Sequence, residues 1–144
     1  MHLPPFEPKK ARILVVEDTN MMRIMMMRHL SQAGYEHVES VEDGQQCLDY
    51  IAEHPVDLIL LDIQMPVLNG YEALKAIKAN PAYKDIAVIM VTAVDNIESV
   101  AQCISDGAED YMAKLFNPIL LTAKIDTSLE LRHLRMAVAA DQSS

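Results

Sequence analysis

The sequence of 144 residues has only two cysteines, no excess of basic residues and no long apolar run. Cys47 and Cys103 make no disulfide framework and have no metal-ligand neighbours, so both are interpreted as small packing residues of helices. The 12 basic against 21 acidic residues give a net charge of -9, which argues against direct contact with nucleic acid. Because the chain also lacks a membrane-spanning run and a signal-peptide core, we expect a cytoplasmic protein without membrane contact.

Short apolar runs alternate with segments of helical periodicity along the chain. Strands are predicted at about residues 12–17, 37–41, 56–62, 86–92 and 110–113. A helix is predicted after each strand, with Gly34 and Gly107 as stops, Asp95 or Asn96 as a start, and Asn117-Pro118 opening the last helix. Five strands that alternate with five helices predict one doubly wound α/β domain, whose parallel sheet is covered on both faces.

Polar residues suited to phosphoryl chemistry stand where the predicted strands end. Glu17 and Asp18 follow the first strand, and Asp62 ends the third. Thr92 ends the fourth strand, and Lys114 follows the fifth. Because ligands bind at the carboxyl edge of an open parallel sheet, we expect these side chains to converge there. Three carboxylates suit Mg²⁺, and Asp62 is the candidate nucleophile toward a phosphoryl group, whose oxygens Lys114 and Thr92 would bind.

Together these motifs closely resemble the receiver domain of two-component response regulators, over about residues 11–131. The matching segments are Val15-Val16-Glu17-Asp18, Leu60-Leu61-Asp62-Ile63-Gln64-Met65-Pro66, Asn69-Gly70-Tyr71-Glu72, Val91-Thr92-Ala93, Gly107-Ala108-Glu109-Asp110-Tyr111 and Lys114. The resemblance implies a flavodoxin-like sheet of five parallel strands in the order 2-1-3-4-5, with five helices. It also implies a signalling switch, not an enzyme that acts on a separate substrate.

The resemblance implies a phosphorylation site with a metal. Asp62 would accept a phosphoryl group from a phosphohistidine on a sensor histidine kinase or a histidine phosphotransfer protein. Asp18, Asp62 and the backbone carbonyl of Gln64 would bind Mg²⁺ directly. Glu17 would act on the metal through water.

The resemblance also implies how the signal leaves the domain. Thr92 would close onto the phosphate, and Tyr111 on the last strand would turn inward. The surface formed by the fourth helix, the fifth strand and the fifth helix would then change. That surface would act on a downstream protein or on a fused output domain.

One position departs from the family pattern. Leu115 follows Lys114, where receivers usually have a proline joined by a cis bond. A cis bond before a non-proline residue costs about 2.5–4 kcal/mol, so we expect a trans bond here, which puts the placement of Lys114 in question. The departure supports an alternative function, a non-phosphorylated pseudo-receiver that serves as an interaction or dimerisation scaffold. The intact acids, Thr92 and Lys114 favour the switch.

Two segments flank the predicted receiver domain. Residues 1–10 form a proline-rich, basic lead that we expect to be flexible. Residues 132–144 are predicted to extend the last helix and to end in a disordered tail. Leu131, Leu134 and Val138 continue an apolar spacing there, which indicates either a coiled-coil extension of a homodimer or a frayed amphipathic helix.

The first predicted helix contains a cluster of five methionines, at positions 21, 22, 25, 26 and 27. Helical spacing cannot turn all of them into the core. The exposed ones would form an adaptable docking face for the partner histidine protein, or they would be exposed only as a by-product of soft core packing. The sequence leaves both alternatives open.

Overall fold

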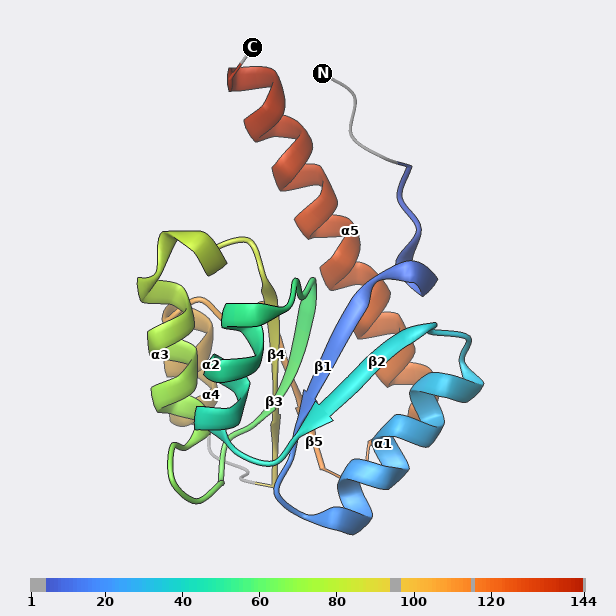
Figure 1. The fold of residues 1–144 in the computed structure, drawn as a ribbon, viewed down its shortest axis with the longest axis vertical. Helices are drawn as coiled ribbons and strands as arrows, with labels where there is room; N and C mark the ends of the chain where they lie inside the picture. Colours follow the sequence, from blue (N-terminus) through green and yellow to red (C-terminus); the bar gives the residue numbers. More distant parts are fainter. Residues whose placement is uncertain (1–4, 94–96, 115, 144) are drawn as a thin grey trace.

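The computed structural model describes residues 5–93, 97–114 and 116–143, and its centre is one parallel sheet (Figure 1). Within the described residues the sheet has five strands in the order β2-β1-β3-β4-β5, which confirms the predicted fold. The strands are β1 (Arg12–Val16), β2 (His37–Val41), β3 (Leu58–Asp62), β4 (Ala87–Thr92) and β5 (Asp110–Ala113). The α-helices are α1 (Asn20–Gln32), α2 (Gly44–Glu53), α3 (Gly70–Ala79), α4 (Ile97–Ser105) and α5 (Pro118–Ser143), and short 3-10 helices η1 (Pro8–Lys10) and η2 (Pro81–Tyr83) precede β1 and β4.

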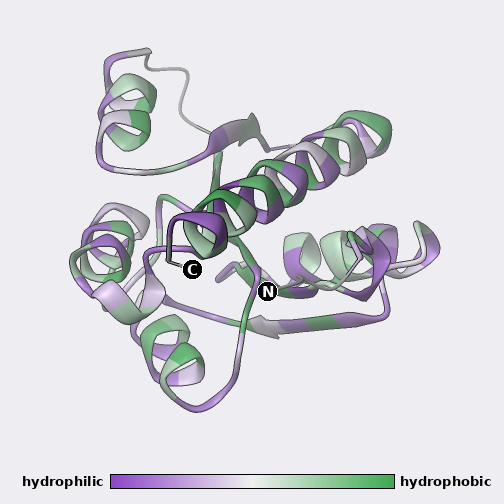
Figure 2. Ribbon diagram, turned by 90° about the horizontal axis from the view of Figure 1, so that it is seen from above, coloured by the Kyte–Doolittle hydropathy of each residue, from purple (hydrophilic) through white to green (hydrophobic). Residues whose placement is uncertain are grey.

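The central strands β3 and β4 are apolar along nearly their whole length because helices cover both of their faces. Every residue of these two strands is buried. Leu58 and Leu60 of β3 belong to the core with α1 and α5, whereas Ile59 and Leu61 belong to the core with α2 and α3. Seen from above, helices lie on both sides of the strands (Figure 2). The free thiols Cys47 and Cys103 lie fully buried in the α2 and α3 core, as their interpretation as packing residues requires.

Polar side chains cap the starts of helices, and glycines follow their ends, largely where the sequence predicts. Asn69 and Glu72 form a reciprocal capping box at the start of α3. Asn117 Oδ1 accepts hydrogen bonds from the first turn of α5, at 2.8 Å from the nitrogen of Ile119. Gly34, after α1, has a φ of +96°, which favours glycine. The predicted caps of α4, Asp95 and Asn96, lie outside the described residues.

The methionine cluster of α1 divides between core and surface. Met22 and Met26 are buried with Leu30. Met21 is exposed, and so is the nearby Ile24. The helix therefore packs on the sheet through a narrow buried stripe and presents apolar side chains outward at its first two turns.

The described part of the N-terminal lead contacts α5 and the segment after α1. The ring of Phe6 contacts the ring of His133 in α5, with 5.5 Å between centroids. The Lys9 ammonium lies 3.8 Å from the centre of the Tyr35 ring, and the Lys9 carbonyl accepts a hydrogen bond from the Glu36 nitrogen at 3.0 Å. Residues 6 and 9 of the lead therefore contact folded elements, and the flexibility expected for residues 1–10 stays a prediction.

Helix α5 is longer than a receiver-sized domain requires. It runs without interruption to Ser143, so positions 141–143 are helical where the sequence predicts a disordered tail. Helices elongate readily through alanine-rich segments such as Ala137, Ala139 and Ala140, which explains the difference. Within the described residues no helix combines the length and the apolar character that crossing a bilayer requires.

Candidate functional site

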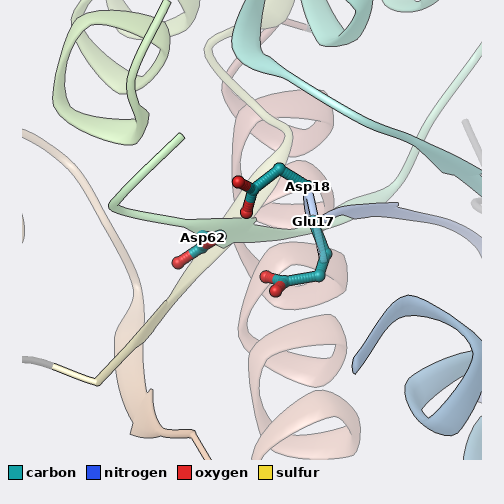
Figure 3. A group of neighbouring side chains, drawn as sticks. All are labelled: Glu17, Asp18 and Asp62. Atoms are coloured by element: carbon teal, nitrogen blue, oxygen red, sulfur yellow. The ribbon is translucent and has the colours of Figure 1, made fainter. Parts of the chain in front are cut away.

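Strand register brings the predicted acidic residues together at the carboxyl edge of the sheet. β1 and β3 pair as far as Val16 and Leu61. The next residues of the two strands, Glu17 and Asp62, are therefore neighbours, and Asp18 follows at the same edge. One oxygen from each of the three carboxylates lies within 4.8 Å of the other two (Figure 3). The predicted convergence of these acids is present in the structure.

Two of the three acids are almost completely removed from solvent. Glu17 and Asp62 are each 1% exposed, whereas Asp18 is exposed. Burying a carboxylate is costly unless it is paired or hydrogen-bonded. A pair of buried carboxylates at a strand edge is therefore more consistent with a binding site than with solvated loop acids.

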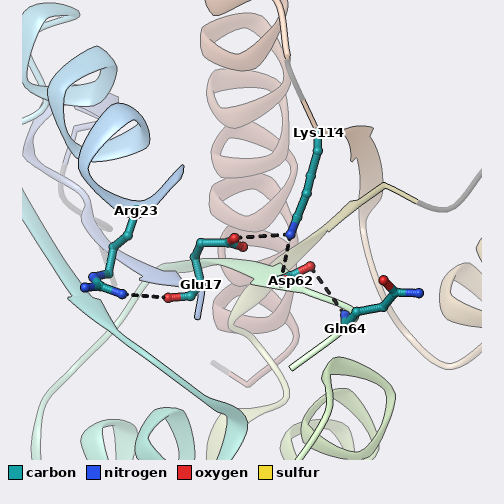
Figure 4. Close-up of polar contacts among 5 residues, drawn as sticks. All are labelled: Glu17, Arg23, Asp62, Gln64 and Lys114. Carbon is teal, nitrogen blue, oxygen red and sulfur yellow. Dashed lines mark hydrogen bonds and ion pairs between the residues drawn. The ribbon is translucent and has the colours of Figure 1, made fainter. Parts of the chain in front are cut away.

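Lys114 supplies the opposite charge. Its Nζ lies 3.1 Å from Glu17 Oε1 and 3.1 Å from Asp62 Oδ2 (Figure 4). The ammonium thus lies at the edge of the sheet where the sequence predicts it, and its predicted contact with phosphoryl oxygens stays a prediction. Leu115, which departs from the family pattern, lies outside the described residues. Burial alone would lower the pKa of Lys114, but its hydrogen bonds to the two carboxylates outweigh burial and raise that pKa.

The ionisation of Asp62 is strongly disfavoured in this environment. Burial raises the pKa of its carboxyl from 3.8 to about 7, and the neighbouring Glu17 adds to the rise. Lys114 acts in the opposite direction but does not compensate. A group that adds positive charge at this edge would lower the pKa of Asp62 and make it a better nucleophile at neutral pH.

The acidic cluster fits a divalent cation by two criteria. Among the described residues, Glu17 Oε2 is the only buried side-chain nitrogen or oxygen atom without a hydrogen-bond partner. When all the acids are ionised, three carboxylates face one ammonium, which leaves an excess of two negative charges. Mg²⁺ accepts a few carboxylates together with water and ligand oxygens, so the donor set suits it.

The loop after β3 is held close to Asp62. The nitrogen of Gln64 lies 3.4 Å from Asp62 Oδ1 (Figure 4), and the nitrogen of Gly70 donates to the Ile63 carbonyl at 2.9 Å. A Cβ at position 70 would overlap the backbone oxygen of Asp62, so only glycine permits this approach. Val67 in the same loop has a φ of +68°, which is a strained conformation for a β-branched residue.

The two predicted switch residues lie on neighbouring strands. Thr92 is buried at the carboxyl end of β4, and its carbonyl accepts a hydrogen bond from the Lys114 nitrogen at 2.8 Å. Tyr111 on β5 is 44% exposed, with the Lys124 ammonium 5.6 Å from the centre of its ring. Tyr111 therefore points outward in this structure, and the predicted inward state remains a prediction.

One residue near the acids is not among those singled out from the sequence. Arg23 of α1 donates from its guanidinium to the Glu17 carbonyl at 3.1 Å (Figure 4). It also forms an ion pair with Glu42 after β2, at 3.5 Å. Arg23 thus ties the segment that carries the acids to α1 and β2. Basic residues are common in the first turns of helices, so the sequence alone does not indicate that Arg23 makes these contacts.

Comparison with known proteins identifies the family. The family model of the response regulator receiver domain matches residues 13–126. The chemotaxis protein CheY of Bacillus subtilis is 36% identical over 118 residues, which cover 82% of this chain and 97% of that protein. A Vibrio cholerae protein named "Probable cyclic di-GMP phosphodiesterase" is 33% identical over 129 residues, which cover 90% of this chain but only 29% of that longer protein.

The solved structure of NtrX from Brucella abortus superposes with a TM-score of 0.83 at 28% identity, over 91% of this chain and 29% of that one. Relatives thus include a protein of about the size of the domain and much longer proteins, of which this chain matches under a third. Three acids and a lysine lie together at the carboxyl edge of the sheet, and the family model matches most of the chain that carries them. The chain therefore belongs to the response regulator receiver domain family, the signalling modules of two-component systems.

Proposed function

We propose that Asp62 accepts a phosphoryl group from a phosphohistidine on a sensor histidine kinase or a histidine phosphotransfer protein. The observation that carries this proposal is the convergence of Lys114 on the buried carboxylates of Glu17 and Asp62. In the transfer, an Asp62 carboxylate oxygen forms a bond to phosphorus while the bond from phosphorus to the imidazole nitrogen breaks. The nitrogen of the donor histidine keeps the electron pair of the broken bond.

The side chains around Asp62 have separate tasks in this proposal. Lys114 is a compact positive charge that can move from a carboxylate oxygen to an oxygen of the transferred group. Thr92 lies at the end of the adjacent strand, and its hydroxyl would donate a hydrogen bond to the same group. Arg23 keeps the Glu17 segment in place through the backbone and does not contact the reacting atoms.

The acids would hold Mg²⁺, with Asp18, Asp62 and the Gln64 carbonyl as direct ligands and Glu17 acting through water. When bound, the ion neutralises charge on the phosphoryl oxygens. The unpartnered Glu17 oxygen and the excess of negative charge support this assignment. The positive charge of the ion would also lower the pKa of Asp62, which burial and the neighbouring Glu17 raise.

We assign the output to the surface of α4, β5 and α5. A phosphoryl group at Asp62 adds negative charge and hydrogen-bond acceptors beside Thr92, which biases the domain between two states. The exposed ring of Tyr111 can gain buried area by turning toward the space that Thr92 leaves. A downstream protein or a fused output domain would read the changed surface, and a cytoplasmic location belongs to the same proposal.

The exposed apolar residues at the start of α1 are the proposed contact for the phosphodonor. Met21 and Ile24 are exposed and belong to the helix that follows the acidic segment Glu17-Asp18. Flexible methionine surfaces adapt to a partner. Met21→Glu and Ile24→Glu variants should lose phosphotransfer from a histidine protein but keep phosphorylation by acetyl phosphate. Unchanged transfer from the histidine protein would rule out this face.

Intact-mass spectrometry tests the proposal. The protein is incubated with Mg²⁺ and acetyl phosphate, beside Asp62→Asn and an Asp49→Asn control on the exposed face of α2. We expect one labile phosphoryl group on the wild type and on Asp49→Asn, and none on Asp62→Asn. No gain on a folded wild type with acetyl phosphate and with phosphorylated histidine proteins would favour the alternative, a non-phosphorylated interaction scaffold.

A further inference from the structure

A row of exposed apolar residues follows the outer side of the α5 extension. Leu131, Leu134 and Val138 are 46%, 52% and 55% exposed. On a helix of 3.6 residues per turn they fall on the side roughly opposite the residues that pack on the sheet, which are Leu121, Ile125 and Leu129. The last turns of α5 also project past the ends of the strands (Figure 1). The row therefore lies where another helix can approach without meeting the domain of the same chain.

Two arginines fix the direction of this extension. Arg132 donates from Nε to the Asp85 carbonyl at 2.8 Å and forms an ion pair with Asp57 at 3.2 Å. Arg135, one turn of the helix later, forms an ion pair with Glu109 before β5. These contacts tie the extension to the amino-terminal edge of the sheet at separate points. The apolar row is thus presented in one orientation, which lowers the entropy cost of binding.

The sequence around the row is complementary to itself in one orientation only. Spacings of three and four residues place Leu131 and Val138 at heptad position a and Leu134 at position d. Glu130 then occupies position g and Arg135 position e. In a parallel pair, Glu130 of each helix faces Arg135 of the other, whereas an antiparallel pair would bring each of these charges against its own copy. Arg135 has donors beyond the one that contacts Glu109.

We propose that two copies of this chain associate through a parallel coiled coil of their α5 extensions. Leu131, Leu134 and Val138 form the seam, and Glu130 pairs with Arg135 across it in both directions. A two-fold axis parallel to the helices places the two domains on the outer sides of the pair. The association does not depend on phosphorylation of Asp62.

Sedimentation equilibrium of the whole chain over a wide range of concentrations tests the seam. Leu134→Glu is compared with Ile119→Glu, because Ile119 is 82% exposed on the same helix but lies outside the row. We expect a monomer–dimer equilibrium for the wild type and for Ile119→Glu. Leu134→Glu should raise the dimer dissociation constant about a hundredfold, roughly tenfold for each copy of the substitution. Matching circular dichroism spectra would show that both variants fold.

A cysteine at the seam tests the orientation. A parallel pair places position 134 of both copies in the same layer, so Leu134→Cys should form a disulfide-linked dimer under mild oxidation, and Ile119→Cys should not. The native thiols, Cys47 and Cys103, are buried and do not interfere. A wild type that stays monomeric up to its solubility limit overturns the proposal. A dimer dissociation constant that Leu134→Glu leaves unchanged also overturns the proposal. A Leu134→Cys protein that forms no disulfide-linked dimer under mild oxidation overturns it as well.

Discussion

Replacing the buried Asp62 with a neutral isostere should stabilise the domain above neutral pH when no divalent cation is present. The pKa of Asp62 rises from 3.8 to about 7 on folding, chiefly because the carboxyl is buried. A tenfold change in proton affinity corresponds to about 1.4 kcal/mol, so ionising Asp62 in the folded protein costs up to about 4 kcal/mol. Asp62→Asn removes this cost, and Lys114 keeps Glu17 as its partner.

The sign of the pH dependence follows from which state holds the proton. Between the two pKa values the folded protein binds a proton at Asp62 that the unfolded chain has lost. The stability of the wild type should therefore fall as the pH rises through this window, and the loss should be complete above about pH 7. Asp62→Asn should lack this component, so the two proteins should differ little near pH 4 and most near pH 8.

Urea unfolding followed by circular dichroism in EDTA measures the effect. We expect Asp62→Asn to exceed the wild type by about 2–4 kcal/mol near pH 8, with a gap that narrows as the pH falls. Asp49→Asn, which changes an exposed carboxylate, should leave stability nearly unchanged. Excess Mg²⁺ should stabilise the wild type and not Asp62→Asn. An Asn variant no more stable than the wild type near pH 8 would refute the reasoning, as would a gap that does not change with pH.

Substitutions at three further positions test the loops around the site. Val67→Gly should raise the free energy of unfolding by about 1 kcal/mol in urea titrations, because glycine adopts the φ of +68° without strain and the side chain it removes is exposed. Val67→Ala should raise the free energy of unfolding by less. A Val67→Gly protein less stable than the wild type would contradict the strain at this position. Gly70→Ala should cost about 1–3 kcal/mol, since its Cβ would overlap the Asp62 oxygen, and an unchanged unfolding midpoint would show that the loop yields freely. Leu115→Pro should accelerate phosphorylation by acetyl phosphate or prolong the phosphorylated state, measured as phosphorylated fraction against time; equal rates for both proteins would contradict a role for Leu115.

The order of the elements and the edge that carries the site could be predicted because local sequence determines them. The apolar run from Leu58 to Leu61 can only be a strand that is covered on both faces, and Asp62 ends it. Strand ends of a parallel sheet meet at one edge, so the acids had to be neighbours once the strands were identified. The predicted position of Lys114 at these acids also agrees with the structure.

Features that depend on contacts between distant segments could not be predicted. Nothing local marks Val67 for a positive φ, because the turn is imposed by the approach of Gly70 to the end of β3. The contact of Phe6 in the N-terminal lead with the ring of His133 joins segments far apart in the chain. The single unpartnered oxygen of Glu17 likewise emerges only when the packing of the whole edge is known.

The most direct test of the proposed function is to locate the modified residue chemically. An aspartyl phosphate is reduced by borohydride to the alcohol, so a phosphorylated Asp62 would become homoserine. The protein is treated with acetyl phosphate and Mg²⁺, reduced, digested and sequenced by tandem mass spectrometry. We expect homoserine at position 62 alone, in amounts that match the phosphorylated fraction. Homoserine at position 18 in place of 62, or none in a protein that has gained a phosphoryl group, would contradict the assignment of Asp62 as the acceptor.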